Sequence, residues 1–163
     1  MLILKWLAML LLVLVVCAMA AGQFGMLQAK PPEGLGVHGG KLKAPSLTEN
    51  SVSSQAGLYP DHPQRLYAAT LPLALRGDGP ASMAKLKDVV LAMPGATLVK
   101  SEPDYLYAQY ATPWLKFVDD VEFWYDPEAK AIQVRSASRV GRRDMGVNRQ
   151  RVEAVRKALA DSP

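Results

Sequence analysis

Hydrophobic and polar residues follow two different patterns in the first part of the chain. Residues 7–21 are apolar throughout, and no charged residue lies between Lys5 and Lys30. A membrane-spanning helix needs about 20 apolar residues and the core of a signal peptide about 7–15, so residues 1–27 are interpreted as a transmembrane anchor or a signal peptide. Residues 28–63 are rich in glycine, proline and serine without periodicity. This composition predicts a flexible linker that holds the following domain off the bilayer.

Both interpretations of residues 1–27 predict the same topology. Lys5 on the short side of the apolar segment favours an amino terminus in the cytoplasm and a domain outside it. We expect a cell-membrane protein that crosses the bilayer once through residues 6–27. If the segment is cleaved, we expect a periplasmic or secreted protein instead.

Details of the apolar segment keep its fate open. Small residues suit signal-peptide cleavage near Ala20, whereas the apolar residues that continue to Leu27 favour a retained anchor. Lipid attachment to Cys17 is a third alternative. The residues just before that cysteine, Leu14 to Val16, are bulky for a lipidation signal.

Residues 64–160 carry the periodic patterns of a single folded domain. The apolar residues between Asp78 and Met93 recur at spacings of three and four, which predicts a helix capped by Asp78 with Pro80 in its first turn. A final helix is predicted with Asn148 as its cap. Its apolar stripe consists of Val152, Val155 and Leu159. The predicted strands cover residues 96–101, 105–112, 118–125 and 132–138.

The order of these elements predicts the fold class. Residues 65–75 alternate weakly and contain Pro72, so they are predicted to form an edge strand or an extended segment. A strand, a helix, further strands and a final helix indicate the α+β class. We predict a small antiparallel sheet of about four strands with two helices packed on one face, preceded by an amino-terminal hydrophobic helix.

The last two predicted strands can be aligned from their side chains alone. Placing Tyr125 opposite Ile132 and Phe123 opposite Val134 joins apolar residues on one face of the sheet. The same register sets Glu122 opposite Arg135 on the other face. A slip of one residue would mix the two faces, so this register is the one we predict.

The charged residues divide into an acidic segment, residues 102–128, and a basic segment, residues 135–157, in a chain of net charge +4. Because the two segments are neighbours in the predicted sheet, we expect them to neutralise each other through ion pairs. The residues assigned to these structural pairs are Asp120, Glu122, Arg135 and Asp144. The pairing argues against nucleic acid as a partner. No metal site is predicted either, because Asp119 would point away from the other carboxylates of its strand.

No catalytic residues are predicted. Ser136 and Ser138 have no histidine in a motif to activate them, and the adjacent carboxylates of Asp119 and Asp120 face opposite sides of a strand. The single cysteine, Cys17, excludes an intramolecular disulfide and a multi-cysteine zinc site. We therefore expect a protein without enzymatic activity or a cofactor. The alternative is an acidic-residue or metal-dependent enzyme based on Asp120, Glu122 and Asp144.

The loop from Gly141 to Gly146 is the candidate binding site. Free backbone N–H groups and the dipole at the start of a helix favour negative charge. The residues assigned to a site for a small anion or a protein partner are Arg139, Arg142, Arg143, Asn148 and Arg151. In the alternative interpretation, the two glycines only supply unusual backbone angles, Asp144 holds an arginine and Asn148 caps the helix.

The segment from Ser136 to Arg151 has the pattern S-x-S-R-x-G-x-x-D-x-G-x-N-x-x-R and resembles the DUF1499 family of proteins of unknown function. Phe117–Phe123 is similar to the F-x-D-D-V-E-F segment of that family, and Asn50–Gln55 is similar to its opening. The family usually shows two cysteines near this opening. This chain has Ala44 and Ser51 at those positions, which removes any disulfide or thiolate metal site that the cysteines would supply.

The resemblance covers roughly residues 40 to 160 and implies family membership without any particular chemistry. Combined with the apolar amino terminus, it favours a membrane-anchored or exported domain of the cell envelope. We expect this domain to bind a protein partner or a small anion at the Gly141–Gly146 loop.

Overall fold

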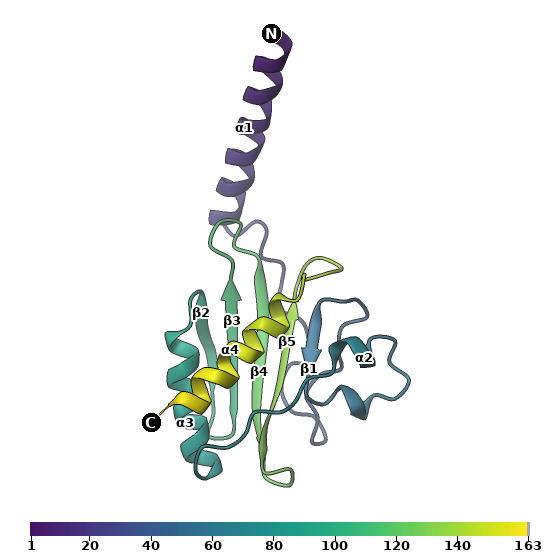
Figure 1. The fold of residues 1–163 in the computed structure, drawn as a ribbon, viewed down its shortest axis with the longest axis vertical. Helices are drawn as coiled ribbons and strands as arrows, with labels where there is room; N and C mark the ends of the chain where they lie inside the picture. Colours follow the sequence, from purple (N-terminus) through teal and green to yellow (C-terminus); the bar gives the residue numbers. More distant parts are fainter. Residues whose placement is uncertain (163) are drawn as a thin grey trace.

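The computed structural model describes residues 1–162, in which one long helix projects from an α+β domain (Figure 1). This helix, α1, spans Leu2–Gln23 and is long and apolar enough to cross a membrane. Its side chains are exposed along almost the whole length, and only Gly22 near its end is buried. The predicted amino-terminal hydrophobic helix is therefore present.

The domain contains one antiparallel sheet of five strands in the order β1-β5-β4-β3-β2. The strands are β1 (Ser51–Ser53), β2 (Ala96–Ser101), β3 (Tyr105–Ala111), β4 (Val118–Asp126) and β5 (Ala131–Ser138). Four of them coincide with the predicted strands to within one residue at each end. The fifth, β1, adds an edge to the sheet beside β5 and was not predicted.

The register of β4 and β5 is the predicted one. Phe123 lies opposite Val134, and Glu122 lies opposite Arg135. Phe123 and Val134 are fully buried in the core. The alternation of apolar and charged residues therefore fixed this register correctly, because only one alignment keeps each face uniform.

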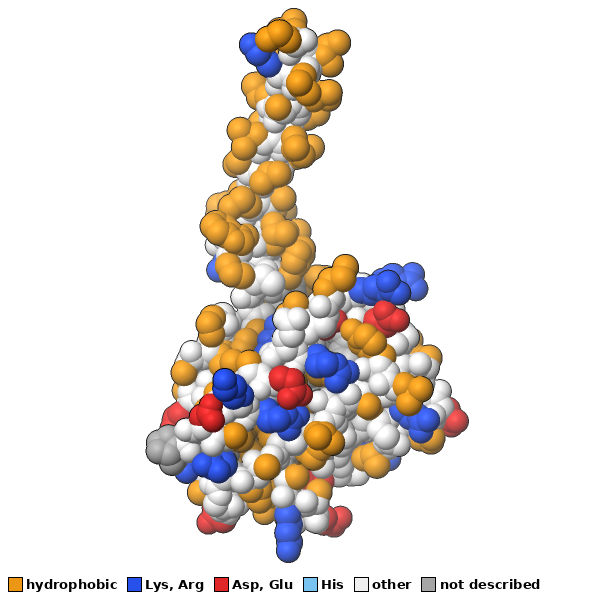
Figure 2. Space-filling view, viewed as in Figure 1, with side chains coloured by type: hydrophobic (Ala, Val, Ile, Leu, Met, Phe, Trp, Pro, Cys, Tyr) orange, Lys and Arg blue, Asp and Glu red, His pale blue; other side chains and the backbone are white. Residues whose placement is uncertain are grey.

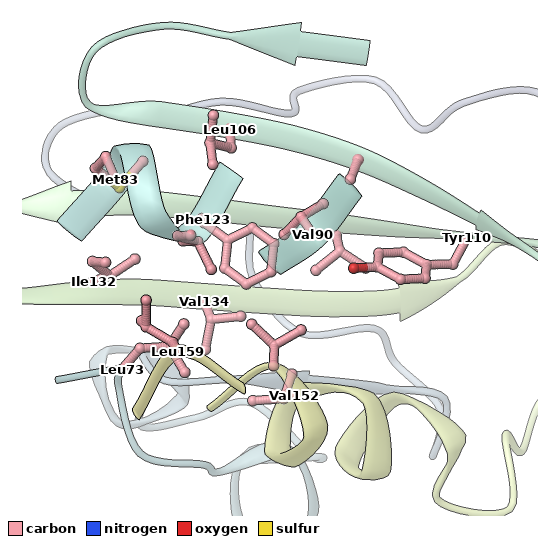
Figure 3. Close-up of a cluster of buried hydrophobic side chains, with 14 of the residues drawn as sticks. Leu73, Met83, Val90, Leu106, Tyr110, Phe123, Ile132, Val134, Val152 and Leu159 are labelled. Carbon is pink, nitrogen blue, oxygen red and sulfur yellow. The ribbon is translucent and has the colours of Figure 1, made fainter. Parts of the chain in front are cut away.

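Two helices cover one face of the sheet, as predicted (Figure 1). They are α3 (Gly79–Ala92) and α4 (Val147–Asp161). The predicted cap of α3 is confirmed, since an oxygen of Asp78 accepts a hydrogen bond of 2.8 Å from the backbone N–H of Ala81. The apolar stripes of both helices pack on the sheet in one core (Figure 3), with Met83, Leu86, Val90, Val152, Val155 and Leu159 among its members.

Residues 65–75 differ from the prediction of an edge strand. They begin with a short helix, α2 (Arg65–Ala68), and continue as extended chain. This chain touches the sheet through isolated bridges, one between Ser53 and Ala69 and one between Leu73 and Ile132. Proline at position 72 has no N–H to donate, so a continuous ladder cannot form there.

The folded domain also begins earlier than residue 64. Residues 29–47, which we call the strap, cross the face of the sheet opposite the helices and lie behind it in Figure 1. Leu42 of the strap is buried against Tyr105 and Tyr107 of β3. After the strap come β1 and a short 3-10 helix, η1 (Ala56–Leu58). The predicted linker over residues 28–63 thus differs from the structure, because isolated apolar residues among glycines and prolines give no periodic signal.

Candidate functional site

The strap covers a row of charged side chains on the outer face of the sheet. Asp120 and Glu122 come from β4, Arg135 comes from β5, and Arg139 follows β5. Residues two apart on a strand point to the same side, so the strands themselves place these four groups together. All four side chains are at least 95% buried. The covered face is therefore an ionic layer inside the protein.

Asp120 and Arg139 form a two-pronged ion pair. Nε of Arg139 lies 2.9 Å from Oδ2 of Asp120, and its NH2 lies 2.7 Å from Oδ1. The remaining NH1 group donates to the backbone carbonyl of Ala29 in the strap. The hydrogen bonds to Asp120 raise the pKa of Arg139. This arginine is therefore fully engaged with its neighbours.

Glu122 and Arg135 are less completely matched. Oε1 of Glu122 accepts hydrogen bonds from the backbone N–H of Gly36 and the hydroxyl of Tyr105. Its Oε2 lies 3.7 Å from NH1 of Arg135. Neither of these two atoms has a hydrogen-bond partner among residues 1–162. Burial lowers the pKa of Arg135, although the carboxylates of Glu122 and Asp120 oppose that shift.

Two tyrosines of β3 complete the layer. The hydroxyl of Tyr105 donates to Glu122 and that of Tyr107 donates to Asp120, over 2.8 and 2.6 Å. Burial is the main cause that raises the pKa of both tyrosines, and the adjacent carboxylates add to it. Both hydroxyls therefore stay protonated and act as donors.

A polar cavity of about 310 Å³ lies between the strap and β5. Lys30 and Lys43 of the strap line it together with Arg135, Arg139 and Asp120. Four cationic side chains thus surround the cavity with one carboxylate, and both oxygens of that carboxylate already bind Arg139. Such a lining favours a small anion, because charge-assisted hydrogen bonds from guanidinium and ammonium groups are among the strongest in proteins.

The other face carries a second polar network, centred on Asn148. Its side-chain NH2 group donates to the backbone carbonyl of Asn50, the hydroxyl of Ser138 and the carboxylate of Asp144. Its side-chain oxygen accepts from Ser136. Asn148 lies inside α4 and is buried, so its prediction as the helix cap is wrong. The cap position belongs to Gly146, whose φ of 83° suits a residue without a side chain.

Asp144 occupies the start of α4. Its carboxylate accepts hydrogen bonds from the backbone N–H groups of Gly146 and Asn148 and from the hydroxyl of Tyr67. Burial acts to raise the pKa of Asp144, but these hydrogen bonds outweigh it, and the pKa lies below its ordinary value. The expected pairing of Asp144 with an arginine does not occur among residues 1–162. An anion at the helix start would have to displace this carboxylate.

The five residues assigned to the binding site do not converge. Arg139 faces the strap, whereas Arg151 binds Asp119 over 2.6 Å and stacks on the ring of Tyr110 at 4.8 Å. Asp119 thus points away from Asp120, as its place on the strand predicts. Arg143 is exposed and pairs with Glu49 over 2.9 Å.

Arg142 of the same loop is also exposed and makes no hydrogen bond or ion pair with any residue that the structure describes. Among residues 1–162, no group of three or more His, Cys, Asp or Glu side chains is placed to hold a metal ion.

A second concavity, a groove of about 650 Å³, lies where the end of α3 and the start of α4 diverge over β2 and β3. Its walls include Met93, Tyr110, Val147 and Arg151. The hydroxyl of Tyr110 is buried and has no hydrogen-bond partner among residues 1–162. Burial raises the pKa of Tyr110 to about 12, and the charge of Arg151 opposes that shift.

Comparison with known proteins was made on the whole chain. Residues 41–159 match the family model described as protein of unknown function, DUF1499. The chain belongs to the DUF1499 family. A search of curated proteins found no match, and a search of solved structures found none either. In this DUF1499 protein the matched region begins inside the strap, so the strap from Lys41 onward, β1 and the sheet form one family unit.

The motif that carries the family resemblance is structural in this DUF1499 protein. Ser136, Ser138, Asp144 and Asn148 all take part in the network that joins β5 to the start of α4. The hydroxyl of Ser51 accepts a hydrogen bond of 2.8 Å from the backbone N–H of Ser46. This bond connects the strap to β1.

Sequence reasoning missed the groups that complete the ionic layer. Lys30 and Lys43 lie in the segment interpreted as a linker, and Tyr105 and Tyr107 were not assigned any site role. The only available signal was the alternation of tyrosines along β3, which places both hydroxyls on the face of Asp120 and Glu122.

Proposed function

We propose that this protein is a single-pass membrane protein whose extracytoplasmic domain binds a small anion, a carboxylate or a phosphate, without catalysing a reaction. The site is the cavity between the strap and β5. The observation that carries the proposal concerns Arg135, which lines this cavity and whose buried NH1 group has no hydrogen-bond partner among residues 1–162.

The buried NH1 group of Arg135 is a hydrogen-bond donor without a partner, and such a donor destabilises the folded protein. An unsatisfied buried polar group destabilises a protein by about 1–3 kcal/mol, and a charged one by more. Arg135 is 3% exposed, and the nearest carboxylate oxygen, on Glu122, lies beyond hydrogen-bond distance. An anion oxygen in the cavity would satisfy this donor, and the ammonium groups of Lys30 and Lys43 would neutralise the remaining charge.

The proposed anion site is the cavity between the strap and β5 and not the Gly141–Gly146 loop, where Asp144 already supplies a negative group to the helix start. Arg139 belongs to both versions of the site. Its contacts with Asp120 suggest a supporting role, in which it holds that carboxylate away from the ligand.

The end of α1 is fitted closely to the domain. A side chain at Gly22 would place its Cβ only 2.5 Å from the carbonyl oxygen of Leu115, so the helix approaches the domain more closely than other residues allow. The amide of Gln23 donates to the backbone carbonyls of Pro113 and Trp114. Both residues lie after Ala20 and would stay with the domain after cleavage there, so the retained anchor is supported instead by the length of α1, whose 22 residues exceed the roughly 7–15 of a signal-peptide core.

The hydrogen bonds of two carboxylates support the proposed absence of catalysis. Both oxygens of Asp120 and of Asp144 accept hydrogen bonds from the protein, so neither group offers a free basic oxygen. An enzyme based on Asp120, Glu122 and Asp144 would also have to join groups from opposite faces of the sheet. Metal analysis of the purified protein and its response to a chelator test that alternative.

The binding proposal is tested by thermal unfolding of the full chain in detergent, with inorganic phosphate or citrate added and chloride at equal ionic strength as the reference. A ligand at 100 times its Kd stabilises the folded state by about 2.7 kcal/mol. That corresponds to a rise in Tm of about 5–10 °C for a chain of this size.

The variant Lys30→Gln/Lys43→Gln should lose this rise in Tm, because both lysines line the cavity and neither is needed in the core. The matched control is Lys157→Gln, an exposed lysine on α4. The double variant Arg142→Gln/Arg143→Gln distinguishes the two sites. If the arginine variant loses the rise in Tm and the lysine variant keeps it, the anion binds at the Gly141–Gly146 loop and the proposal is wrong.

A further inference from the structure

Two loops stand at the end of the domain from which α1 emerges (Figure 1). Residues 112–117 connect β3 to β4, and residues 139–146 connect β5 to α4. The first loop is fastened to α1 through Gly22 and Gln23, as described above. Because the anchor and the domain meet without slack, a membrane that α1 crosses must lie against this end of the domain.

The side chains on these loops are unusual for a surface that faces water. Trp114 is 67% exposed and Met145 is 85% exposed. Met145 is held there by a backbone with φ of 52°, a conformation that residues with side chains adopt at a cost. In Figure 2, hydrophobic side chains and a group of Lys and Arg side chains are visible at this end of the domain.

The same loops present cations that the folded domain does not bury. Lys116, Arg142 and Arg143 are all at least partly exposed. Arg143 shares an exposed ion pair with Glu49, and Arg142 has no hydrogen-bond or ion-pair partner within the described part of the chain. Neither Arg142 nor Arg143 lines the anion cavity between the strap and β5.

We infer that this end of the domain rests in the headgroup region of an anionic bilayer. The inference rests on α1 being the retained anchor of the proposed function. Trp114 and Met145 enter the interface between headgroups and acyl chains, where tryptophan is enriched in membrane proteins. Lys116, Arg142 and Arg143 bind the phosphates of anionic lipids, because guanidinium and ammonium groups make strong charge-assisted hydrogen bonds to phosphate. The partner of the Gly141–Gly146 loop is thus a lipid surface.

The experiment uses the full chain in vesicles of phosphatidylglycerol and phosphatidylcholine whose acyl chains are brominated close to the headgroup. The chain has 3 tryptophans, so Trp6→Phe/Trp124→Phe leaves Trp114 as the only tryptophan. We expect strong quenching of its fluorescence. The matched control, Trp6→Phe/Trp114→Phe, leaves Trp124, which lies near the other end of β4, about 20 Å away by the rise of the strand. This control should not be quenched.

A second measurement tests the role of the two arginines. In the background that retains Trp114, Arg142→Gln/Arg143→Gln should reduce the quenching in anionic vesicles and leave it unchanged in vesicles of phosphatidylcholine alone. Equal effects in both lipids would overturn the role of the arginines.

The variant that retains Trp6 separates this inference from the anchor on which it rests. Quenching of Trp6 by bromine shows that α1 is inserted. If Trp6 is quenched and Trp114 is not, the anchor stands and the docking of the domain is wrong. If neither is quenched, both fail, whereas anion binding in the strap cavity is measured independently by the thermal shift.

Discussion

Glu122 and Arg135 lie directly opposite each other on β4 and β5, with NH1 of the arginine 3.7 Å from Oε2 of the glutamate. Both side chains are buried, and neither of these atoms has a hydrogen-bond partner among residues 1–162. They are close enough to attract each other but are not locked together. Two opposite charges that are buried together stabilise each other, and removing one leaves the other uncompensated.

Removing either charge should therefore unfold the protein more easily. Glu122→Gln and Arg135→Gln should each lower the free energy of unfolding by about 3–5 kcal/mol, because each leaves an uncompensated buried charge. The double variant should lose less than the sum of the two, with a coupling energy of about 0.5–3 kcal/mol. Denaturant titration of the full chain in detergent measures all four free energies, and strict additivity would contradict the pair.

The start of α4 should respond to acid. The pKa of Asp144 is lower in the folded state than in the unfolded state, where it is about 3.9. The ionised carboxylate therefore stabilises the fold at every pH above the unfolded-state pKa. This contribution is lost as the pH falls through the lower folded pKa. Asp144→Asn should lower the Tm at pH 7 and flatten the decline of Tm below pH 5. A variant with the same acid profile as the wild type would show that Asp144 is not the titrating group.

The hydroxyl of Tyr110 should be dispensable for folding. Because it is buried without a hydrogen-bond partner among residues 1–162, Tyr110→Phe should stabilise the protein by about 1–3 kcal/mol, the cost of an unsatisfied polar group. Tyr107→Phe is the matched control, since its hydroxyl donates to the buried carboxylate of Asp120. It should destabilise the protein by about 1.5–3 kcal/mol. Thermal unfolding of both variants measures these changes. A clear loss of stability in Tyr110→Phe would contradict the prediction, because it would mean that the hydroxyl of Tyr110 has a hydrogen-bond partner.

The junction between α1 and the domain should depend on a residue without a side chain. Gly22→Leu would force Cβ into the backbone of Leu115, so the helix end should separate from the loop at residues 112–117. Limited proteolysis should then cut the chain after α1 faster than in the wild type. Ala20→Leu is the control, because Ala20 is exposed on the same helix. Equal cleavage of the two variants would mean that the contact at Gly22 contributes nothing to the junction.

The parts of the fold that could be predicted are those in which residues at regular spacings along the chain lie on the same face of a helix or strand. The pairing of Phe123 with Val134 followed from alternation, and the stripe of α3 followed from spacings of three and four. The strap gave no such signal. Leu42 is buried by contacts with β3, which lies more than sixty positions away in the chain.

The candidate site was predicted only in part for a related physical reason. The predicted strand register set Glu122 opposite Arg135, as in the structure, whereas Arg139 was assigned to the loop site and pairs with Asp120. The sequence could not distinguish a cap from an interior residue at Asn148. That choice depends on the left-handed backbone of Gly146 and on the position of Asp144, neither of which appears in a residue pattern.

The close contact of Gly22 with Leu115 also limits where this protein can act. A domain on a long flexible arm samples a volume around its attachment point, whereas this one can only drift sideways with its helix. Under the proposed function, ligands would therefore arrive at the height of the strap cavity, either dissolved in the adjoining compartment or carried by another protein of the same membrane. If α1 is retained in a membrane, encounters with partners in that membrane would be searches in two dimensions, with the domain presented in one orientation.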